Sequence, residues 1–111
     1  MEKIKEVTFI TVKTKESYES LQNGKFEDQE LYKYITRAIE DLRKSPLRHI
    51  RIPEDLIPQK YVQDYGVKSL WKYDLPNGWR LLYTITGNDI KIVSVILEWL
   101  DHKEYERRFN Y

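Results

Sequence analysis

Two short glycine-containing turns within residues 69–105 constrain the fold of this chain more than any other feature. Asn77-Gly78 and Gly87-Asn88 separate runs that are rich in β-branched, aromatic and leucine residues. Because asparagine and glycine tolerate the positive φ angles that a tight hairpin needs, each turn predicts that its flanking runs pair antiparallel. The predicted meander consists of the strands Leu70–Leu75, Trp79–Ile85 and Ile90–Leu97.

The N-terminal segment Ile4–Val12 predicts a fourth strand, because β-branched and aromatic residues recur along it. Ile90–Leu97 is apolar on both faces at most positions, which is typical of a central strand. We therefore expect Ile4–Val12 to lie beside it. In Trp79–Ile85, alternation places the odd-numbered residues on one face of the sheet and Arg80 with its even-numbered neighbours on the other.

Helical periodicity is clearest in Glu27–Lys44, which has acidic residues in its first turn and basic residues in its last, as the helix dipole favours. Its apolar stripe predicts that one side of the helix lies on the sheet. The stripe consists of Leu31, Ile35, Ala38 and Leu42. The irregular segment Leu47–Gly66 contains a predicted helical turn at Gln59–Tyr65. Asp101–Phe109 predicts a short terminal helix, and Lys13–Asn23 is either a loop or a short helix.

Length and composition limit the class of the protein. A chain of 111 residues suits one domain, so we predict a single α+β domain over residues 1–111. Its small antiparallel meander sheet has about four strands, with helices packed on one face and a short C-terminal helix. The absence of cysteine excludes disulfides and thiolate chemistry and fits a reducing cytoplasm. No apolar stretch approaches the roughly 20 residues of a membrane span, so we expect no membrane partner.

The sequence contains no motif for a metal or cofactor, and we expect neither. His49 and His102 are its two histidines and lack the spacing of metal ligands. The four glycines are isolated, so there is no glycine-rich phosphate loop. Because the net charge is only +1, any binding of nucleic acid must depend on local clusters of basic residues.

Three polar residues at one end of the predicted sheet are the candidates for catalysis: Arg80, His102 and Tyr105. Arg80 projects from an otherwise apolar strand and could clamp a phosphate, or it could form an ion pair with Glu98 or Asp74. His102 follows the last strand, where an imidazole can exchange protons near neutrality or simply bond the helix start. Tyr105, three residues on, shares a helical face with His102 and could contact a base, donate a proton or pack in the core.

Basic residues near these three could contact an RNA backbone, or they could be solvated surface charges. The window RKSPLRHIR is the most basic in the chain, and clustered cations gain affinity from counterion release. The candidate RNA-binding residues are Arg48, Arg51, Lys60, Lys68, Lys72, Arg107, Arg108 and Tyr111.

The stretch LWKYDLPNGWRLLYTI and the ending LEWLDHKEYERRF resemble the RelE/ParE superfamily of toxins from type II toxin–antitoxin systems. The similarity covers about Glu27 to Tyr111. It implies a RelE-like fold and a cytoplasmic toxin that enters the ribosomal A site and cleaves mRNA there, neutralised by a cognate antitoxin. In such ribonucleases the 2′-hydroxyl of the RNA attacks the adjacent phosphate, and the protein positions groups and stabilises charge.

The resemblance also implies roles for single residues. Arg80 matches the strand arginine that contacts the scissile phosphate, His102 the C-terminal acid/base residue, and Tyr105 the terminal aromatic that stacks on the base or shuttles a proton. Lysines that stabilise charge in one branch align with Trp71 and Tyr73. Lys72 lies between these two positions and is therefore predicted on the opposite face of the strand.

Two alternatives remain open at the level of sequence. The chain could be a non-catalytic member such as a ParE-like gyrase inhibitor, which uses the same scaffold without acid/base chemistry. It could also be a degenerate member that makes only protein contacts. In that case the terminal aromatics Trp99, Phe109 and Tyr111 could form a surface for homo-oligomers.

Overall fold

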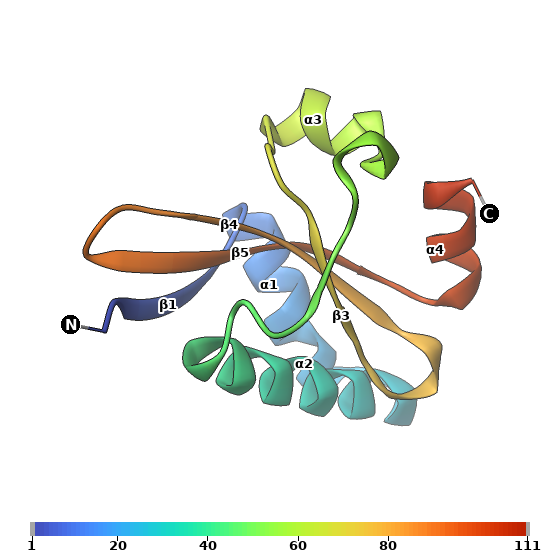
Figure 1. Ribbon diagram of the computed structural model, residues 1–111. Coiled ribbons are helices and arrows are strands. Elements are labelled where there is room, and N and C mark those ends of the chain that lie inside the picture. The colour runs from blue at the N-terminus through green and yellow to red at the C-terminus, as the bar shows by residue number, and fades with distance from the viewer. Residues whose placement is uncertain (1, 111) are drawn as a thin grey trace.

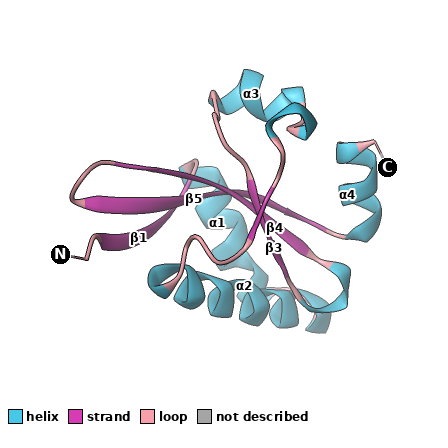
Figure 2. Cartoon of the chain, in the orientation of Figure 1, coloured by secondary structure: helices cyan, strands magenta, loops and turns pink. Residues whose placement is uncertain are grey.

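A five-stranded sheet in the order β1-β5-β4-β3-β2 forms the centre of the protein (Figure 1). The computed structural model describes residues 2–110. The strands are β1 (Ile4–Phe9), β2 (Ile50–Arg51), β3 (Trp71–Asp74), β4 (Arg80–Gly87) and β5 (Lys91–Leu100). The helices are α1 (Val12–Ser20), α2 (Phe26–Lys44), α3 (Gln59–Tyr65) and α4 (His102–Phe109) (Figure 2). The predicted α+β class is therefore confirmed.

The sheet differs from the prediction in its strand number and in one strand direction. β3, β4 and β5 form the expected antiparallel meander, and β1 lies beside β5 as expected. However, β1 runs parallel to β5, so the sheet is mixed. The alternation of side chains within a strand does not encode its direction, which depends on the path of the helices that follow. The fifth strand, β2, has only two residues and is too short to show any periodicity.

The turn between β3 and β4 has the geometry that Asn-Gly predicts. Asn77 has φ 60° and Gly78 has φ 80°, both in the left-handed region. The amide of Leu75 donates to the carbonyl of Trp79 at 2.9 Å and closes the turn. Asp74 is consequently paired directly with Arg80 across the hairpin.

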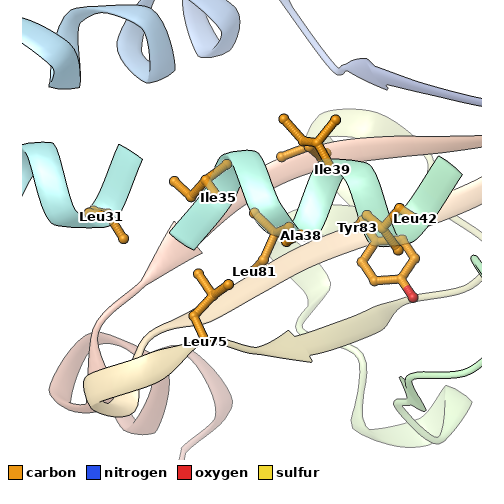
Figure 3. Close-up of a cluster of buried hydrophobic side chains, with 9 residues drawn as sticks. Leu31, Ile35, Ala38, Ile39, Leu42, Leu75, Leu81 and Tyr83 are labelled. Carbon is orange, nitrogen blue, oxygen red and sulfur yellow. The ribbon is translucent and has the colours of Figure 1, made fainter. Parts of the chain in front are cut away.

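Helix α2 covers one face of the sheet, as its apolar stripe predicts (Figure 3). Leu31, Ile35, Ala38 and Leu42 are all buried and contact side chains from the meander. The contacted residues that are themselves buried are Leu75, Leu81, Tyr83 and Ile96. The odd-numbered side chains of β4 therefore face α2, which confirms the alternation predicted for this strand.

The segment that could be a loop or a short helix forms α1. The hydroxyl of Thr11 accepts a hydrogen bond from the Thr14 amide at 3.0 Å and caps the helix start. Tyr18 stacks on Phe9 of β1 and on Tyr32 of α2, with ring centroids 5.3 and 4.7 Å apart. These contacts join α1 to the α2 side of the molecule.

Helices α3 and α4 lie on the other face of the sheet, so the helical layer predicted on one face is accompanied by helices on the second face. A second buried cluster joins Tyr61 of α3 and Tyr105 of α4 to Leu82 and Leu97 of the sheet. An irregularity in β5 creates part of this cluster. Leu82 pairs with Glu98 and Tyr83 with Ile96, which leaves Leu97 as a bulged residue. Because a bulge shifts the alternation by one residue, it brings both Leu97 and Glu98 to the α3–α4 side.

Candidate functional site

A hollow of about 410 Å³ opens where β2, β3 and β4 meet α4. Arg80, His102 and Tyr105, the three residues that the sequence singled out, all line it. Arg80 begins β4 and is paired with Leu100 at the end of β5, so the chain enters α4 directly beside it. We call this depression the β2–α4 hollow. Its lining consists of Ile50, Arg51, Ile52, Pro53, Lys72, Arg80, His102, Tyr105 and Glu106.

The Arg80 side chain is held against the sheet and is only 19% exposed. One terminal nitrogen of its guanidinium donates to the carbonyl of Gly78 at 2.6 Å. Its Nε lies 3.2 Å from Oδ1 of Asp74 but makes no hydrogen bond, so the attraction there is electrostatic. Of the two ion-pair partners open at the level of sequence, the structure selects Asp74. Glu98 is paired instead with Arg108.

Lys72 lies on the face of β3 opposite Trp71 and Tyr73, as the sequence predicts, and this face also presents Arg80. It is paired with Leu82 across the hairpin, two residues from the Asp74–Arg80 pair, so all four share a face. Its Nζ donates to Oδ1 of Asp74 at 3.1 Å, and its side chain is 18% exposed. Trp71 and Tyr73 pack on the α2 side instead. The hollow therefore contains a lysine, although the two positions that align with the lysines of the RelE/ParE branch are Trp71 and Tyr73 on the other face.

Tyr105 is buried, with 5% of its surface exposed. Its ring stacks on Phe109 at 4.4 Å between centroids. The cationic groups of Lys72 and Arg80 lie over the same ring, 5.5 and 5.3 Å from its centroid. In this conformation the ring supports the two cations through cation–π attraction and has no open face for a base.

His102 is the exposed member of the candidate site, with 64% of its side chain accessible. It is the first residue of α4, whose start is fixed by a capping box. The carboxylate of Asp101 accepts from the Glu104 amide at 2.8 Å, and Glu104 accepts from the Asp101 amide at 3.0 Å. One turn further on, Glu106 contacts Nε2 of the imidazole. This contact orients the ring and leaves its second nitrogen for a ligand.

Arg51 completes the positive charge of the hollow. It extends from the edge strand β2, is exposed, and makes no ion pair with any other residue of the described range 2–110. Lys72 and Arg80 already share one carboxylate, whereas Arg51 has none. A phosphate entering the hollow would therefore meet one unneutralised guanidinium and two cations held by Asp74.

The other predicted RNA-binding residues lie away from the β2–α4 hollow. Arg48 lines a separate depression of about 350 Å³ near the end of α2. Lys60 pairs with Asp64 on α3 at 2.8 Å, and Lys68 and Arg107 are exposed. Arg108 points inward to Glu98 and Tyr61 rather than outward. Tyr111 lies outside the described residues.

The depression near α2 also contains His49, whose ring packs against Tyr73 at 4.3 Å. Burial lowers the pKa of the His49 imidazole below its usual 6.5, although the charge of Asp41 opposes the shift. Tyr73 donates its hydroxyl hydrogen bond to the same Asp41. Burial first, and then this bond, raises the pKa of Tyr73 to about 12. Neutral His49 is thus part of a packed aromatic pair and lies apart from the basic groups of the β2–α4 hollow.

Two members of the site were not proposed as functional from the sequence. Glu106 follows His102 by four residues, a helical spacing that brings side chains into contact and could have indicated the pair. Asp74 had been considered only as a partner of Arg80, and the hairpin register shows that it also holds Lys72. Arg51 was a candidate from its charge, but its position on an edge strand beside the hollow could not be anticipated, since a strand of two residues leaves no pattern.

No group of three or more potential metal-ligating side chains occurs among residues 2–110. Within the same range, no helix is long and apolar enough to cross a membrane. No family model, no curated protein and no solved structure matches this chain. The β2–α4 hollow combines three basic side chains with an exposed imidazole.

Proposed function

We propose that this protein is an endoribonuclease that cleaves mRNA through attack of the RNA 2′-hydroxyl on the adjacent phosphate. One observation carries the proposal: Arg51, Lys72 and Arg80 converge from three strands on an open hollow that also presents the exposed imidazole of His102. Cations placed around a phosphodiester stabilise the charge that develops on its oxygens. An imidazole can exchange protons near neutral pH.

In this reaction the 2′-oxygen forms a bond to phosphorus and the bond to the 5′-oxygen breaks. The products are a 2′,3′-cyclic phosphate and a 5′-hydroxyl, so one proton passes from the attacking to the leaving oxygen. Lys72 and Arg80 hold the phosphate and stabilise the intermediate charge. His102, oriented by Glu106, carries the proton. Tyr105 acts through its ring, because it positions the two cations and is itself buried.

The resemblance to RelE/ParE toxins adds the biological setting of the proposal. The substrate is then mRNA in the ribosomal A site, the protein is the toxin of a type II system in the cytoplasm, and a cognate antitoxin is its natural partner. The modest charge of the hollow supports an RNA that is presented by a larger assembly. Three cations, two of which share the single negative charge of Asp74, are few for tight binding of free RNA.

The direct test is cleavage of ribosome-bound mRNA by the purified protein. We expect Arg80→Ala to lower the rate by about 10²–10³-fold, the usual effect of removing one group that stabilises a transition-state charge. Arg37→Ala, which removes an exposed arginine from α2 on the other face, is the matched control and should retain activity. Expression in a bacterial host should stop growth, and Arg80→Ala should relieve the arrest. A wild-type protein that leaves ribosome-bound mRNA intact would refute the proposal.

The burial of Tyr105 favours a second candidate function, a non-catalytic binding protein such as a gyrase inhibitor. A buried Tyr105 cannot stack on a base or pass a proton to the RNA, which are the roles that the resemblance implies for it. In that case His102→Ala would leave growth arrest unchanged, and DNA supercoiling by gyrase would fail. A degenerate member that only self-associates would cause no arrest and would sediment as an oligomer. Phe109, however, is buried in the second cluster, between the sheet and helices α3 and α4, and does not form such a surface.

A further inference from the structure

Lys72 and Arg80 approach the same oxygen atom of Asp74. The Lys72 Nζ lies 3.1 Å from Oδ1, and the Arg80 Nε lies 3.2 Å from it. These two cations are largely buried, with 18% and 19% of their side chains exposed, whereas the Asp74 side chain is 50% exposed. A single anionic oxygen therefore stands at the point where the two positive groups converge.

This oxygen has the chemistry of a phosphate oxygen. Both are anionic acceptors that a lysine and an arginine can bind together, and one cannot occupy the position while the other is there. Other contacts hold the two cations as well: each lies over the ring of Tyr105, and Arg80 donates to the carbonyl of Gly78. Asp74 has no other such contact: it ends β3, it is half exposed, and within residues 2–110 its carboxylate pairs only with these two cations.

We propose that Asp74 is an internal counter-anion that a phosphodiester must displace from Lys72 and Arg80, so that it sets the affinity of the β2–α4 hollow for RNA. The inference rests on the proposed function, because it takes the phosphodiester of RNA as the ligand. Asp74 holds the cations in place while the hollow is empty and opposes the binding of any anion that cannot replace it. It is a positioning residue that limits affinity.

The consequence is that removal of the Asp74 charge tightens RNA binding. A unit charge at roughly 4 Å contributes about 1 kcal/mol even in bulk water, so we expect Asp74→Asn to raise the affinity by at least about fivefold. Glu30→Gln is the matched control. It removes one carboxylate that pairs with Lys33 on α2, away from the hollow and from every candidate RNA-binding residue, and changes the net charge by the same amount. Its affinity should stay close to that of the wild type.

The probe is a single-stranded oligonucleotide that is 2′-O-methylated throughout and therefore cannot be cleaved. Its dissociation constant is measured by fluorescence anisotropy at one ionic strength, and competition with inorganic phosphate shows whether the gain extends to a free anion. Asp74→Thr, which suits a strand end, gives a second variant should the asparagine fold poorly. Tighter binding by the Asp74 variants and not by Glu30→Gln supports the proposal. Equal affinities, or weaker binding by the Asp74 variants, overturn it.

Binding and cleavage are measured separately, so the two proposals can fail independently. If wild-type protein cleaves ribosome-bound mRNA but Asp74→Asn binds the methylated probe no more tightly, the counter-anion role is wrong and the nuclease remains. If Asp74→Asn gains affinity while the wild type leaves mRNA intact, the anion site is correct and the nuclease is wrong.

Discussion

The guanidinium of Arg108 donates a hydrogen bond to the carboxylate of Glu98 beneath α4. Tyr61 of α3 donates its hydroxyl hydrogen bond to the same carboxylate oxygen, and Arg108 also lies over the Tyr61 ring, 5.6 Å from its centroid. One carboxylate on β5 thus joins α3 and α4 to the sheet. Since α4 carries His102 and Tyr105, these contacts of Glu98 with Tyr61 and Arg108 fix the position of the candidate site.

Loss of Arg108 should therefore destabilise the protein. Arg108→Ala leaves Glu98, which is 28% exposed, without its counter-charge, and we expect the free energy of unfolding to fall by about 1–3 kcal/mol. Arg107→Ala removes the exposed arginine next to it and should change stability by less than about 0.5 kcal/mol. Urea denaturation of both variants measures the difference. Equal losses of unfolding free energy in the two variants would mean that the Arg108–Glu98 pair does not stabilise the protein.

Substitutions of Tyr105 should separate its ring from its hydroxyl. Tyr105→Phe retains the ring beneath Lys72 and Arg80, so we expect RNA cleavage close to the wild type. Tyr105→Leu removes two cation–π contacts and should cost about 1–3 kcal/mol of unfolding free energy and weaken RNA binding. Thermal unfolding and a cleavage assay check both. If Tyr105→Phe abolishes cleavage while the fold is intact, the hydroxyl acts on the substrate and the ring alone does not explain the residue.

The parts of the fold that could be predicted from the sequence depend on neighbouring residues. The turn at Asn77 and Gly78 and the apolar stripe of α2 are local patterns, and both form as expected. The direction of β1, the existence of β2 and the bulge at Leu97 depend on pairing between distant segments. The periodicity of the sequence therefore does not predict these three features.

The candidate site shows the same division. Arg80 and His102 could be placed together because β4 begins and β5 ends at the same edge of the meander. Alternation correctly placed Lys72 on the face opposite Trp71 and Tyr73, but only the hairpin pairing shows that this face is the one with Arg80. Tyr105 was correctly placed beside His102 on α4, but its burial depends on packing against β4 and Phe109. Helical spacing alone cannot distinguish an exposed ring from a buried one.

Tyr73 should make stability depend on pH in the alkaline range. Its folded pKa, about 12, is above the usual 10.0, so the neutral phenol is favoured in the folded protein. Its contribution is fully present below pH 10 and is lost as the pH rises toward 12. Tyr73→Phe cannot ionise, so we expect a shallower decline of unfolding free energy across this window than in the wild type. Asp41→Asn removes the negative charge beside the Tyr73 hydroxyl and should move the absorbance titration of Tyr73 to lower pH. An unchanged decline in Tyr73→Phe would contradict the assignment.

Arg51 should contribute to RNA binding mainly through charge, because it reaches the β2–α4 hollow from an exposed edge strand and has no ion-pair partner within residues 2–110. For single-stranded nucleic acid, each phosphate contact adds about 0.7 to the slope of log affinity against log salt concentration. We expect Arg51→Ala to reduce the slope by about this amount, whereas Arg37→Ala on α2 should leave it unchanged. Anisotropy titrations with the methylated oligonucleotide over a series of salt concentrations give both slopes. Since the two variants lose the same charge, a reduction common to both would show that RNA senses only the net charge of the protein, and would remove Arg51 from the binding site.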